Sequence, residues 1–210
     1  MITSAIAGRA RGPVHARGPT DGTTWLQAGA ALALWTLATA GVTVFKVLSD
    51  GQGDTLERDL LTSTKGVLVS GRALALKFWA MRLRQSCWAH LLCQLVSFAE
   101  RDGPTRTLGR ELLDCTRVIF AYGYDFKEGR HTREQVAARI APVRVDFERT
   151  LRRAIDANIK GLGGSCSTMW EHREALWTFV SVDGVEPTNN HLARAARLRA
   201  LAQTLLRSPE

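Results

Sequence analysis

Twenty consecutive residues, Leu26–Phe45, carry no charge, and this run constrains the fold of the chain more than any other feature. Arg9, Arg11 and Arg17 precede it, so its length and flanking charge suit a single membrane-spanning helix. A set of buried strands is the alternative. Many residues of the run are Ala, Gly and Thr rather than Leu or Ile, which makes membrane insertion marginal. Hydropathy alone leaves both interpretations open.

Short apolar segments in and after this run have the composition of strands. Residues Val42–Val47 are rich in β-branched and aromatic side chains, which strands prefer. Residues Gly66–Ser70 form a short apolar segment that suits the centre of a sheet. We therefore expect strands near residues 14–21, 31–36, 42–47 and 66–70, a helix near 54–62 and a short extended segment near 83–87.

The second half of the chain has helical periodicity. Its clearest stretch is 132–158, where apolar residues recur every three or four positions, at Val136, Ile140, Val143, Phe147, Leu151 and Ile155. Thr132 and Gln135 have the spacing of a capping box, and Pro142 is expected to kink the helix. Gly161, Gly163 and Gly164 should end the helical hairpin. Further helices are expected near residues 88–101, 105–121, 171–181 and 189–206.

The charge balance favours an anionic partner. The chain of 210 residues has 28 Lys and Arg against 20 Asp and Glu, a formal net charge of +8. Nucleic acid is the simplest such partner, and a solvated basic surface is the alternative. The four cysteines, Cys87, Cys93, Cys115 and Cys166, lack paired metal-ligand spacing, and the chain is too large for a disulfide scaffold. Reduced thiols and a cytoplasmic location are therefore expected.

Five short segments follow one another in a characteristic order. They are Asp21–Gln27, Gly41–Phe45, Gly66–Ser70, Arg84–Leu91 and Asn189–Arg197. In this order they resemble the catalytic region of bacterial insertion-sequence transposases of the IS66 type, which are DDE enzymes with a ribonuclease H-like fold. The fourth segment contains Cys-Trp-Ala-His-Leu, a signature of that family. The resemblance extends from about Val14 to Arg197.

The resemblance implies three catalytic acids, of which the first two follow strands. The first strand of the family reads Asp-Glu-Thr-Gly-Trp, and this chain matches it at Asp21, Thr23 and Trp25. The second acid stands in the triplet Ser-Asp-Arg. In this chain Gly71 takes the place of that aspartate. Glycine has no side chain and cannot bind a metal ion.

The third acid of the family stands at the start of a helix, after Asn-Asn and two further residues. Here Asn189 and Asn190 are followed by Ala193 where the family has glutamate. In the family the three acids hold Mg²⁺ for DNA cleavage and strand transfer. Only Asp21 is retained, as part of an incomplete metal site. This copy is therefore expected to be truncated, catalytically inactive and without tightly bound magnesium.

Basic residues near the lost acids are candidates for DNA contacts. They are Arg72, Lys77, Arg82 and Arg84 after the second position, and Arg194, Arg197 and Arg199 after the third. They are expected to hold phosphates without reading sequence, a salt-sensitive mode, and a solvated face is the alternative for each. The acids after the third strand, including Asp50, are interpreted as solvated. Cys87 and His90 have Cys-x-x-His spacing, for which packing is favoured over zinc.

The sequence thus predicts an α/β fold, a ribonuclease H-like mixed sheet with a helical insertion between the sheet and the last helix. Residues 1–13 are expected to be disordered, 14–87 to form the sheet region, 88–165 the insertion, and 166–210 the helices that return to the sheet. The expected function is that of a transposase-derived domain with residual DNA binding or association with transposase subunits in a homo-oligomer. A single-pass membrane protein anchored by residues 26–45 is the alternative from another class, and a non-folding product of a decayed gene is a third.

Overall fold

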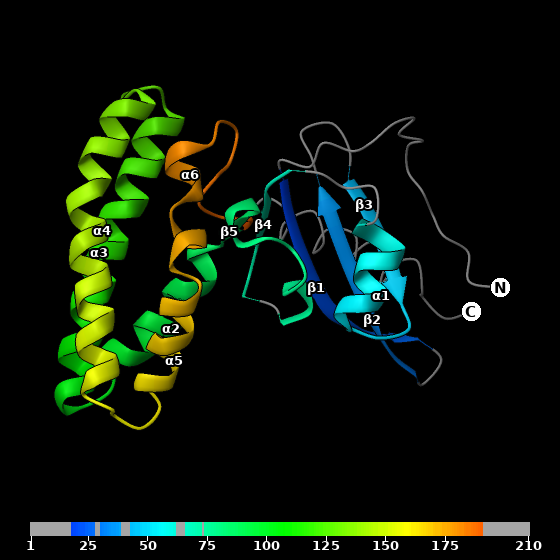
Figure 1. The fold of residues 1–210 in the computed structure, drawn as a ribbon, viewed down its shortest axis with the longest axis horizontal. Coiled ribbons are helices and arrows are strands. Elements are labelled where there is room, and N and C mark those ends of the chain that lie inside the picture. Colours follow the sequence, from blue (N-terminus) through cyan, green and yellow to red (C-terminus); the bar gives the residue numbers. More distant parts are fainter. Residues whose placement is uncertain (1–17, 28–29, 39–42, 62–65, 73, 191–210) are drawn as a thin grey trace, which may run out of the picture. The chain divides into compact units, whose positions relative to one another are not determined.

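The computed structural model describes residues 18–27, 30–38, 43–61, 66–72 and 74–190, and it is a mixed α/β structure (Figure 1). The chain divides into two compact units. The first comprises residues 1–84 and 188–210, and the second comprises residues 85–187. The boundaries expected after residues 87 and 165 stay predictions.

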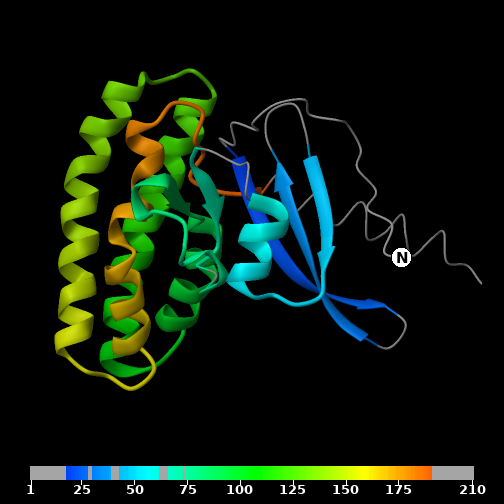
Figure 2. The same cartoon turned by 45° about the vertical axis from the view of Figure 1, so that its right-hand side comes forward.

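A mixed sheet forms the framework of the first unit. The strands β1 (Gly18–Gln27), β2 (Ala30–Ala38) and β3 (Thr43–Leu48) pair in antiparallel order, and β4 (Leu68–Ser70) pairs in parallel with β1. The order across the sheet is β3-β2-β1-β4-β5. The strand β5 (Arg84–Ser86) begins at Arg84, which is the last residue of the first unit before the chain enters the second. The long β1 and β2 strands are clearest in Figure 2.

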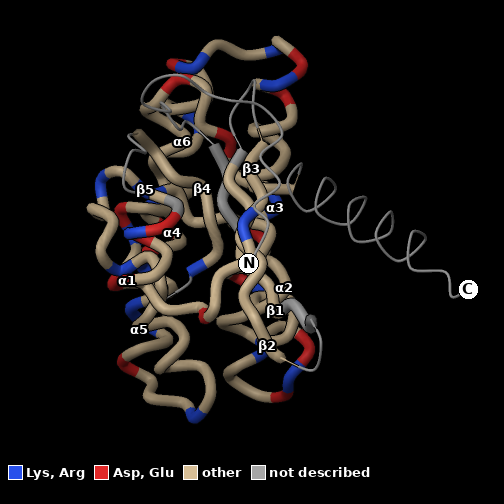
Figure 3. Tube along the Cα trace, turned by 90° about the vertical axis from the view of Figure 1, so that its right-hand side faces the viewer, with Lys and Arg blue, Asp and Glu red and all other residues tan. Residues whose placement is uncertain are grey.

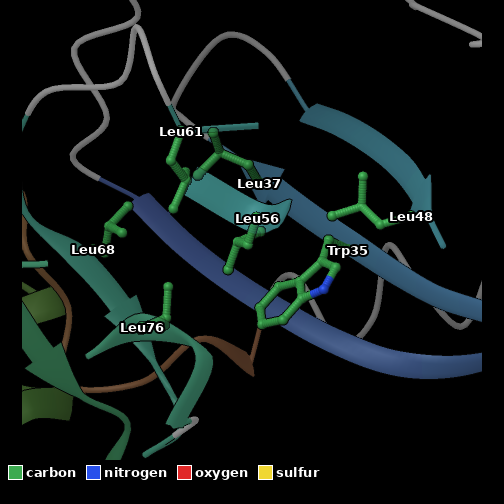
Figure 4. Packing of buried hydrophobic residues seen from close by; sticks show 7 residues of the cluster. All are labelled: Trp35, Leu37, Leu48, Leu56, Leu61, Leu68 and Leu76. Carbon is green, nitrogen blue, oxygen red and sulfur yellow. The ribbon is translucent and has the colours of Figure 1, made fainter. Parts of the chain in front are cut away.

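One face of this sheet carries the core of the first unit. The short helix α1 (Gly53–Leu56) continues into a single π-helical stretch, Glu57–Leu61, and packs on that face. The core side chains are each at most 5% exposed, and Figure 4 shows them gathered between the helix and the strands: Trp35, Leu37, Leu48, Leu56, Leu61, Leu68 and Leu76. Trp35 and Leu37 are two residues apart, so the pleat of β2 places them on the same face.

The uncharged run forms strands in the part that the structure describes. Within residues 26–45, every described residue belongs to β1, β2 or β3. Across the described ranges, no helix is both long and apolar enough to cross a membrane. A strand was expected near residues 14–21, and β1 continues beyond that range to Gln27. It does so because each residue of Thr20–Gln27 has a partner on β2, although this segment lacks strict alternation.

Helices make up most of the second unit. α3 and α4 form a hairpin that packs with α2 and α5, and a 3₁₀ helix, η4, leads into the short α6. The elements are α2 (Trp88–Ala99), α3 (Gly103–Lys127), α4 (Arg133–Asp156), α5 (Gly163–Glu171), η4 (Arg173–Leu176) and α6 (Thr178–Ser181).

The helix α4 has the start that its sequence predicts. The backbone amide of Gln135 donates to Thr132 Oγ1 at 3.3 Å, and the amide of Thr132 donates to Gln135 Oε1 at 2.9 Å. This reciprocal pair confirms the predicted capping box. The helix continues through Pro142, which is exposed.

The helix expected near residues 171–181 is wrong in its limits. α4 ends at Asp156 and Gly161 lies in the turn that follows, while the other two glycines, Gly163 and Gly164, also open the next helix, α5. Cys166 and Met169 bury one side of α5, and the chain then tightens into η4. Ala175, Leu176 and Trp177 are consecutive and all buried, so this segment is enclosed by the protein on more than one side.

The centre of the second unit is aromatic. The rings of Trp88 and Phe147 lie 5.1 Å apart between centroids, Trp88 and Trp177 lie 5.2 Å apart, and Phe147 and Trp177 lie 6.0 Å apart. All three side chains are at most 4% exposed. Trp88 Nε1 also donates to the carbonyl of Leu176 at 2.8 Å, so the indole of the Cys-Trp-Ala-His-Leu segment is both packed and hydrogen-bonded.

Gln85 connects the beginning of this unit to its end. Its side chain is fully buried. Nε2 donates to the carbonyl oxygens of Leu176 at 3.1 Å and Ser86 at 2.7 Å, and Oε1 accepts the backbone amide of Phe179 at 2.8 Å. One amide group therefore satisfies three buried backbone groups, two of them on the η4–α6 segment.

Replacing Gln85 with methionine should destabilise the protein strongly. Methionine has a similar volume, but it leaves the backbone amide of Phe179 without an acceptor and removes one of the two hydrogen bonds to the carbonyl of Leu176. We expect the loss to be about 2–4 kcal/mol. The free energy of unfolding from urea titration measures this loss. Gln52→Met, at an exposed position before α1, is the control and should change stability by less than about 0.5 kcal/mol. Equal effects of the two substitutions would contradict this role of Gln85.

Candidate functional site

A cavity of about 570 Å³ opens on the first unit beside the core. It is lined by Thr24 from β1, Trp35 from β2, Asp50 after β3 and Gly71 after β4, among others. Segments widely spaced along the chain therefore contribute to one hollow. Most of its lining is apolar or backbone, and Asp50 is the lining residue with a carboxylate.

Gly22 and Trp35 shape one wall of this cavity. They are paired across β1 and β2. A Cβ atom added to Gly22 would lie 2.9 Å from two indole carbons of Trp35, closer than real Cβ contacts come. The ring of Trp35 is 5% exposed and belongs to the core, so it cannot move aside freely. A side chain at position 22 would thus conflict with the packed indole.

The end of β4 forms another wall. Ser70 is buried, and its Oγ donates to the carbonyl of Gly71 at 2.8 Å. Gly71 is half-buried and contributes only backbone to the cavity. Because β4 pairs with β1 at Gly18–Leu68 and Pro19–Val69, the chain leaves β4 beside the beginning of β1.

The predicted acid positions are only partly within the described chain. Asp21 is in β1, where it pairs with Thr36, and its neighbour Gly22 lines the same cavity as Gly71. The structure thus brings the first and second segments to neighbouring strands. Ala193 lies outside the described residues, as do the predicted DNA contacts Arg194, Arg197 and Arg199. The meeting of all three acid positions stays a prediction.

Asp50 lies at the cavity, where the sequence indicated only a solvated charge. It is half-buried, and its Oδ1 accepts the backbone amide of Gln52 at 2.9 Å in a tight turn. Gly53 makes this turn approach η2 (Leu74–Leu76) closely, since a Cβ there would lie 2.8 Å from the carbonyl oxygen of Ala75. The only signal in the sequence was the Asp-Gly-x-Gly turn that follows a strand.

The described residues do not by themselves form a site for two magnesium ions. Over the described positions, no group of three or more His, Cys, Asp or Glu side chains could hold a metal ion. Gly71 offers no ligand, and Ser70 already donates its hydroxyl to a backbone carbonyl. Cys87 is buried at the start of α2, while His90 on the same helix is exposed, so this pair also belongs to no metal cluster among those positions.

Arg84, one of the predicted DNA contacts, is engaged within the protein. It is 8% exposed, and its Nε donates to the carbonyl of Trp79 at 2.7 Å while its Nη2 donates to that of Leu76. Burial lowers the pKa of this guanidinium, but arginine starts so high that it stays charged. Arg84 therefore stabilises the loop of residues 74–83 through hydrogen bonds to its backbone.

The other predicted cations on this loop differ in exposure. Lys77 and Arg82 are exposed, and Arg72 is half-buried. Arg82 belongs to the 3₁₀ helix η3 (Met81–Leu83), which Trp79 secures by donating from Nε1 to the carbonyl of Leu83 at 3.1 Å. Lys77 and Arg82 thus lie on a loop whose backbone accepts hydrogen bonds from the side chains of Trp79 and Arg84.

The net charge is divided unequally between the two units. Residues 85–187 contain 14 Lys and Arg and 14 Asp and Glu, so the second unit is neutral. The remaining residues contain 14 Lys and Arg and 6 Asp and Glu. The whole charge of +8 therefore belongs to the first unit. Figure 3 shows both signs distributed along the described part of the trace.

These features describe a mixed α/β protein with a basic sheet unit, a neutral helical unit and a cavity where β1 and β4 adjoin. The chain matches the family model described as "Transposase IS66 family" over residues 20–206. Since the match covers most of the chain, the protein belongs to this family, and the resemblance read from its motifs is confirmed. None of the curated proteins and none of the solved structures matches it significantly.

Membership in a transposase family implies DNA as a partner and generally magnesium as a cofactor. Beside the expected first acid, Gly22 stands where the motif that the sequence resembles has glutamate. The packing gives a physical reason for glycine there, because the indole of Trp35 covers the position. Gly22 and Trp35 are therefore mutually dependent in this chain.

Alanine at position 22 should be costly only while Trp35 is present. We expect Gly22→Ala to destabilise the protein by about 1–3 kcal/mol through overpacking against the indole. In a Trp35→Leu background the same change should cost much less, and urea unfolding of the four proteins measures the coupling. Gly51→Ala is the matched control, because its Cβ would lie 4.0 Å from the Cβ of Ala33, an ordinary contact. Simple additivity of Gly22→Ala and Trp35→Leu would show that the two residues are not coupled.

Proposed function

We propose that this protein is a transposase-derived domain with a ribonuclease H-like sheet that binds duplex DNA without cleaving it. The parallel pairing of β1 with β4 supports this fold, because it sets the strand of the first acid beside the strand of the second. The helical unit between β5 and residue 188 supports it as well, as the expected insertion.

The strand register supports a shared location for the first two acid positions. Gly18 pairs with Leu68 and Pro19 with Val69, so continuing this register by two residues would set position 21 beside position 71. Positions 21 and 71 would then lie side by side, one on β1 and the other directly after β4.

The lost acids account for the absence of cleavage in this proposal. In-line displacement of a phosphodiester needs charge stabilisation on both the attacking and the leaving oxygen, which carboxylate-held metal ions normally provide. Position 71 supplies backbone only, and Ala193 has a methyl group where the family has a carboxylate. A single carboxylate, Asp21, would remain. Asp50 is held in its own turn and does not replace the others.

The observation that carries DNA binding is the division of charge. All of the net charge of +8 belongs to residues 1–84 and 188–210, most of it on residues outside the described ranges, and none belongs to residues 85–187. Cations on one unit attract the phosphate backbone without regard to sequence and release counterions as they bind. Lys77 and Arg82, which are exposed on the loop of residues 74–83, are the described residues best suited to contact phosphates.

Removing these two cations should weaken DNA binding and its salt dependence together. For Lys77→Ala/Arg82→Ala we expect affinity for a random duplex to fall about 10-fold at low salt, and the slope of log K against log salt to decrease by up to about 2. Fluorescence anisotropy over a range of NaCl concentrations measures both quantities. Arg110→Ala/Lys160→Ala removes two exposed cations from the neutral unit and serves as the control, with little expected change.

Two results would contradict DNA binding by the first unit. One is a wild-type protein that fails to bind duplex DNA at low salt, or binds with an affinity independent of salt. The other is an equal loss of affinity in the Lys77/Arg82 variant and in the control variant. Either result would leave the basic unit as a solvated surface.

Restoring both acids should recreate a metal site that the present chain lacks. We expect no saturable Mg²⁺ or Mn²⁺ binding by the wild type in calorimetric titration, and saturable binding by Gly71→Asp/Ala193→Glu. Each single substitution should fail, because one added carboxylate still leaves the set incomplete. Gly51→Asp/Ala193→Glu, which adds a carboxylate at another point of the same cavity, should fail too. Metal-dependent DNA cleavage by the wild type would refute the proposed loss of activity.

A further inference from the structure

The helix α3 extends well past the core that it packs on. Its buried residues all lie between Thr105 and Ile119, and none of its last eight residues, 120–127, is buried. Four of these eight are aromatic: Phe120, Tyr122, Tyr124 and Phe126. Tyr124 is 59% exposed and Phe126 is 38% exposed. Aromatic side chains in this number outside a core are unusual, because each forgoes a large burial free energy.

Arginines lie against three of these rings. The guanidinium carbons are 5.0 Å from the ring centroid of Tyr124 for Arg130, 4.8 Å from that of Phe126 for Arg133, and 5.4 Å from that of Tyr122 for Arg139. Cation–π contacts of this kind restrict the rotamers of both side chains in the free protein. Less side-chain entropy is then lost when a partner binds. Tyrosine, phenylalanine and arginine are also the side chains enriched at protein interfaces. We call residues 120–139 the hairpin tip.

The charge of the hairpin tip does not suit DNA. It contains four cations (Lys127, Arg130, Arg133 and Arg139) and three carboxylates (Asp125, Glu128 and Glu134). Two of the cations also meet acids of the following loop, with Lys127 3.7 Å from Glu186 and Arg133 2.6 Å from Asp183. Counted with Glu186 and Asp183, this surface has four cations and five carboxylates, so it lacks the net positive charge that binding to a polyanion requires. A mixed, nearly balanced surface instead matches another surface of the same kind.

We propose that the hairpin tip is a self-association surface at which two copies of this chain pair. A two-fold axis would bring one tip against the other, so that exposed Tyr124 and Phe126 become buried and cations of one copy face carboxylates of the other. The neutrality of the helical unit supports this pairing, because two copies approaching through it meet no net repulsion. Residues 120–139 number about as many as a small interface has per side, so the dimer should be weak.

The association is measured on the full chain without DNA, which separates this inference from the proposed function. Sedimentation equilibrium from about 5 to about 500 µM should show an average mass that rises from 23.1 kDa towards twice that value. Tyr124→Ser/Phe126→Ser should weaken association at least about 10-fold. Val145→Ser, on α4 outside the tip and 61% exposed, should leave it unchanged. Circular dichroism and a cooperative thermal transition establish that each variant is folded.

A charge-reversal pair tests how the two tips face each other. Lys127→Glu/Arg130→Glu makes the tip acidic, and Glu128→Lys/Glu134→Lys makes it basic. Each variant alone should associate less than the wild type, and an equimolar mixture should regain association. A wild type that stays monomeric at the highest concentration overturns the proposal, and so does a folded aromatic variant that associates normally. Loss of DNA affinity in the aromatic variant with unchanged self-association would also overturn it, in favour of a nucleic-acid surface.

Discussion

The carbonyl oxygen of Leu176 accepts two buried side-chain hydrogen bonds, from Gln85 Nε2 and from Trp88 Nε1, and the helical unit depends on them. A buried carbonyl or amide without a hydrogen-bond partner costs more free energy than a typical hydrogen bond contributes. Separating the strand β5 from the segment η4–α6 would leave such groups without partners, and this penalty holds the two segments together. The stack of Trp88, Phe147 and Trp177 lies over the same point. A long helical segment can therefore leave β5 and return with its two ends fixed in one place.

Sequence patterns predicted the helices and strands that are specified by residues close together in the chain. The capping box at Thr132 and the apolar periodicity behind it are sufficient to specify α4, and the β-branched residues after position 42 are sufficient for β3. The limits of β1 depend instead on pairing with β2, which no short window of sequence contains. Arg84 illustrates the same difficulty for a site. An arginine in a basic stretch looks like a phosphate contact, and only the carbonyls of Trp79 and Leu76, brought close by the folded loop, make it internal.

The three candidate acid positions stay predictions, and the structure shows only that two of the segments that carry them are neighbours. The motif order located Asp21 and Gly71 on segments that the structure places on adjoining strands, and Ala193 lies beyond the described residues. The cavity and its lining could not be anticipated, because Gly22, Trp35 and Asp50 meet through pairing and turns. The glycine opposite Trp35 is informative here. The large indole of Trp35 on β2 fills the space that a side chain at position 22 of β1 would occupy. Glycine in place of the motif's glutamate at this position is therefore compatible with close packing.

The two units differ in what their surfaces can recognise. A unit with excess positive charge interacts with any polyanion, and its affinity depends on ionic strength more than on shape. A neutral unit with paired charges and exposed aromatic rings has no such long-range attraction, so it can recognise only a surface that fits at short range. Neither property depends on a bound metal ion. The proposed DNA binding and the proposed self-association would therefore persist in a copy without the catalytic acids, because neither uses those residues.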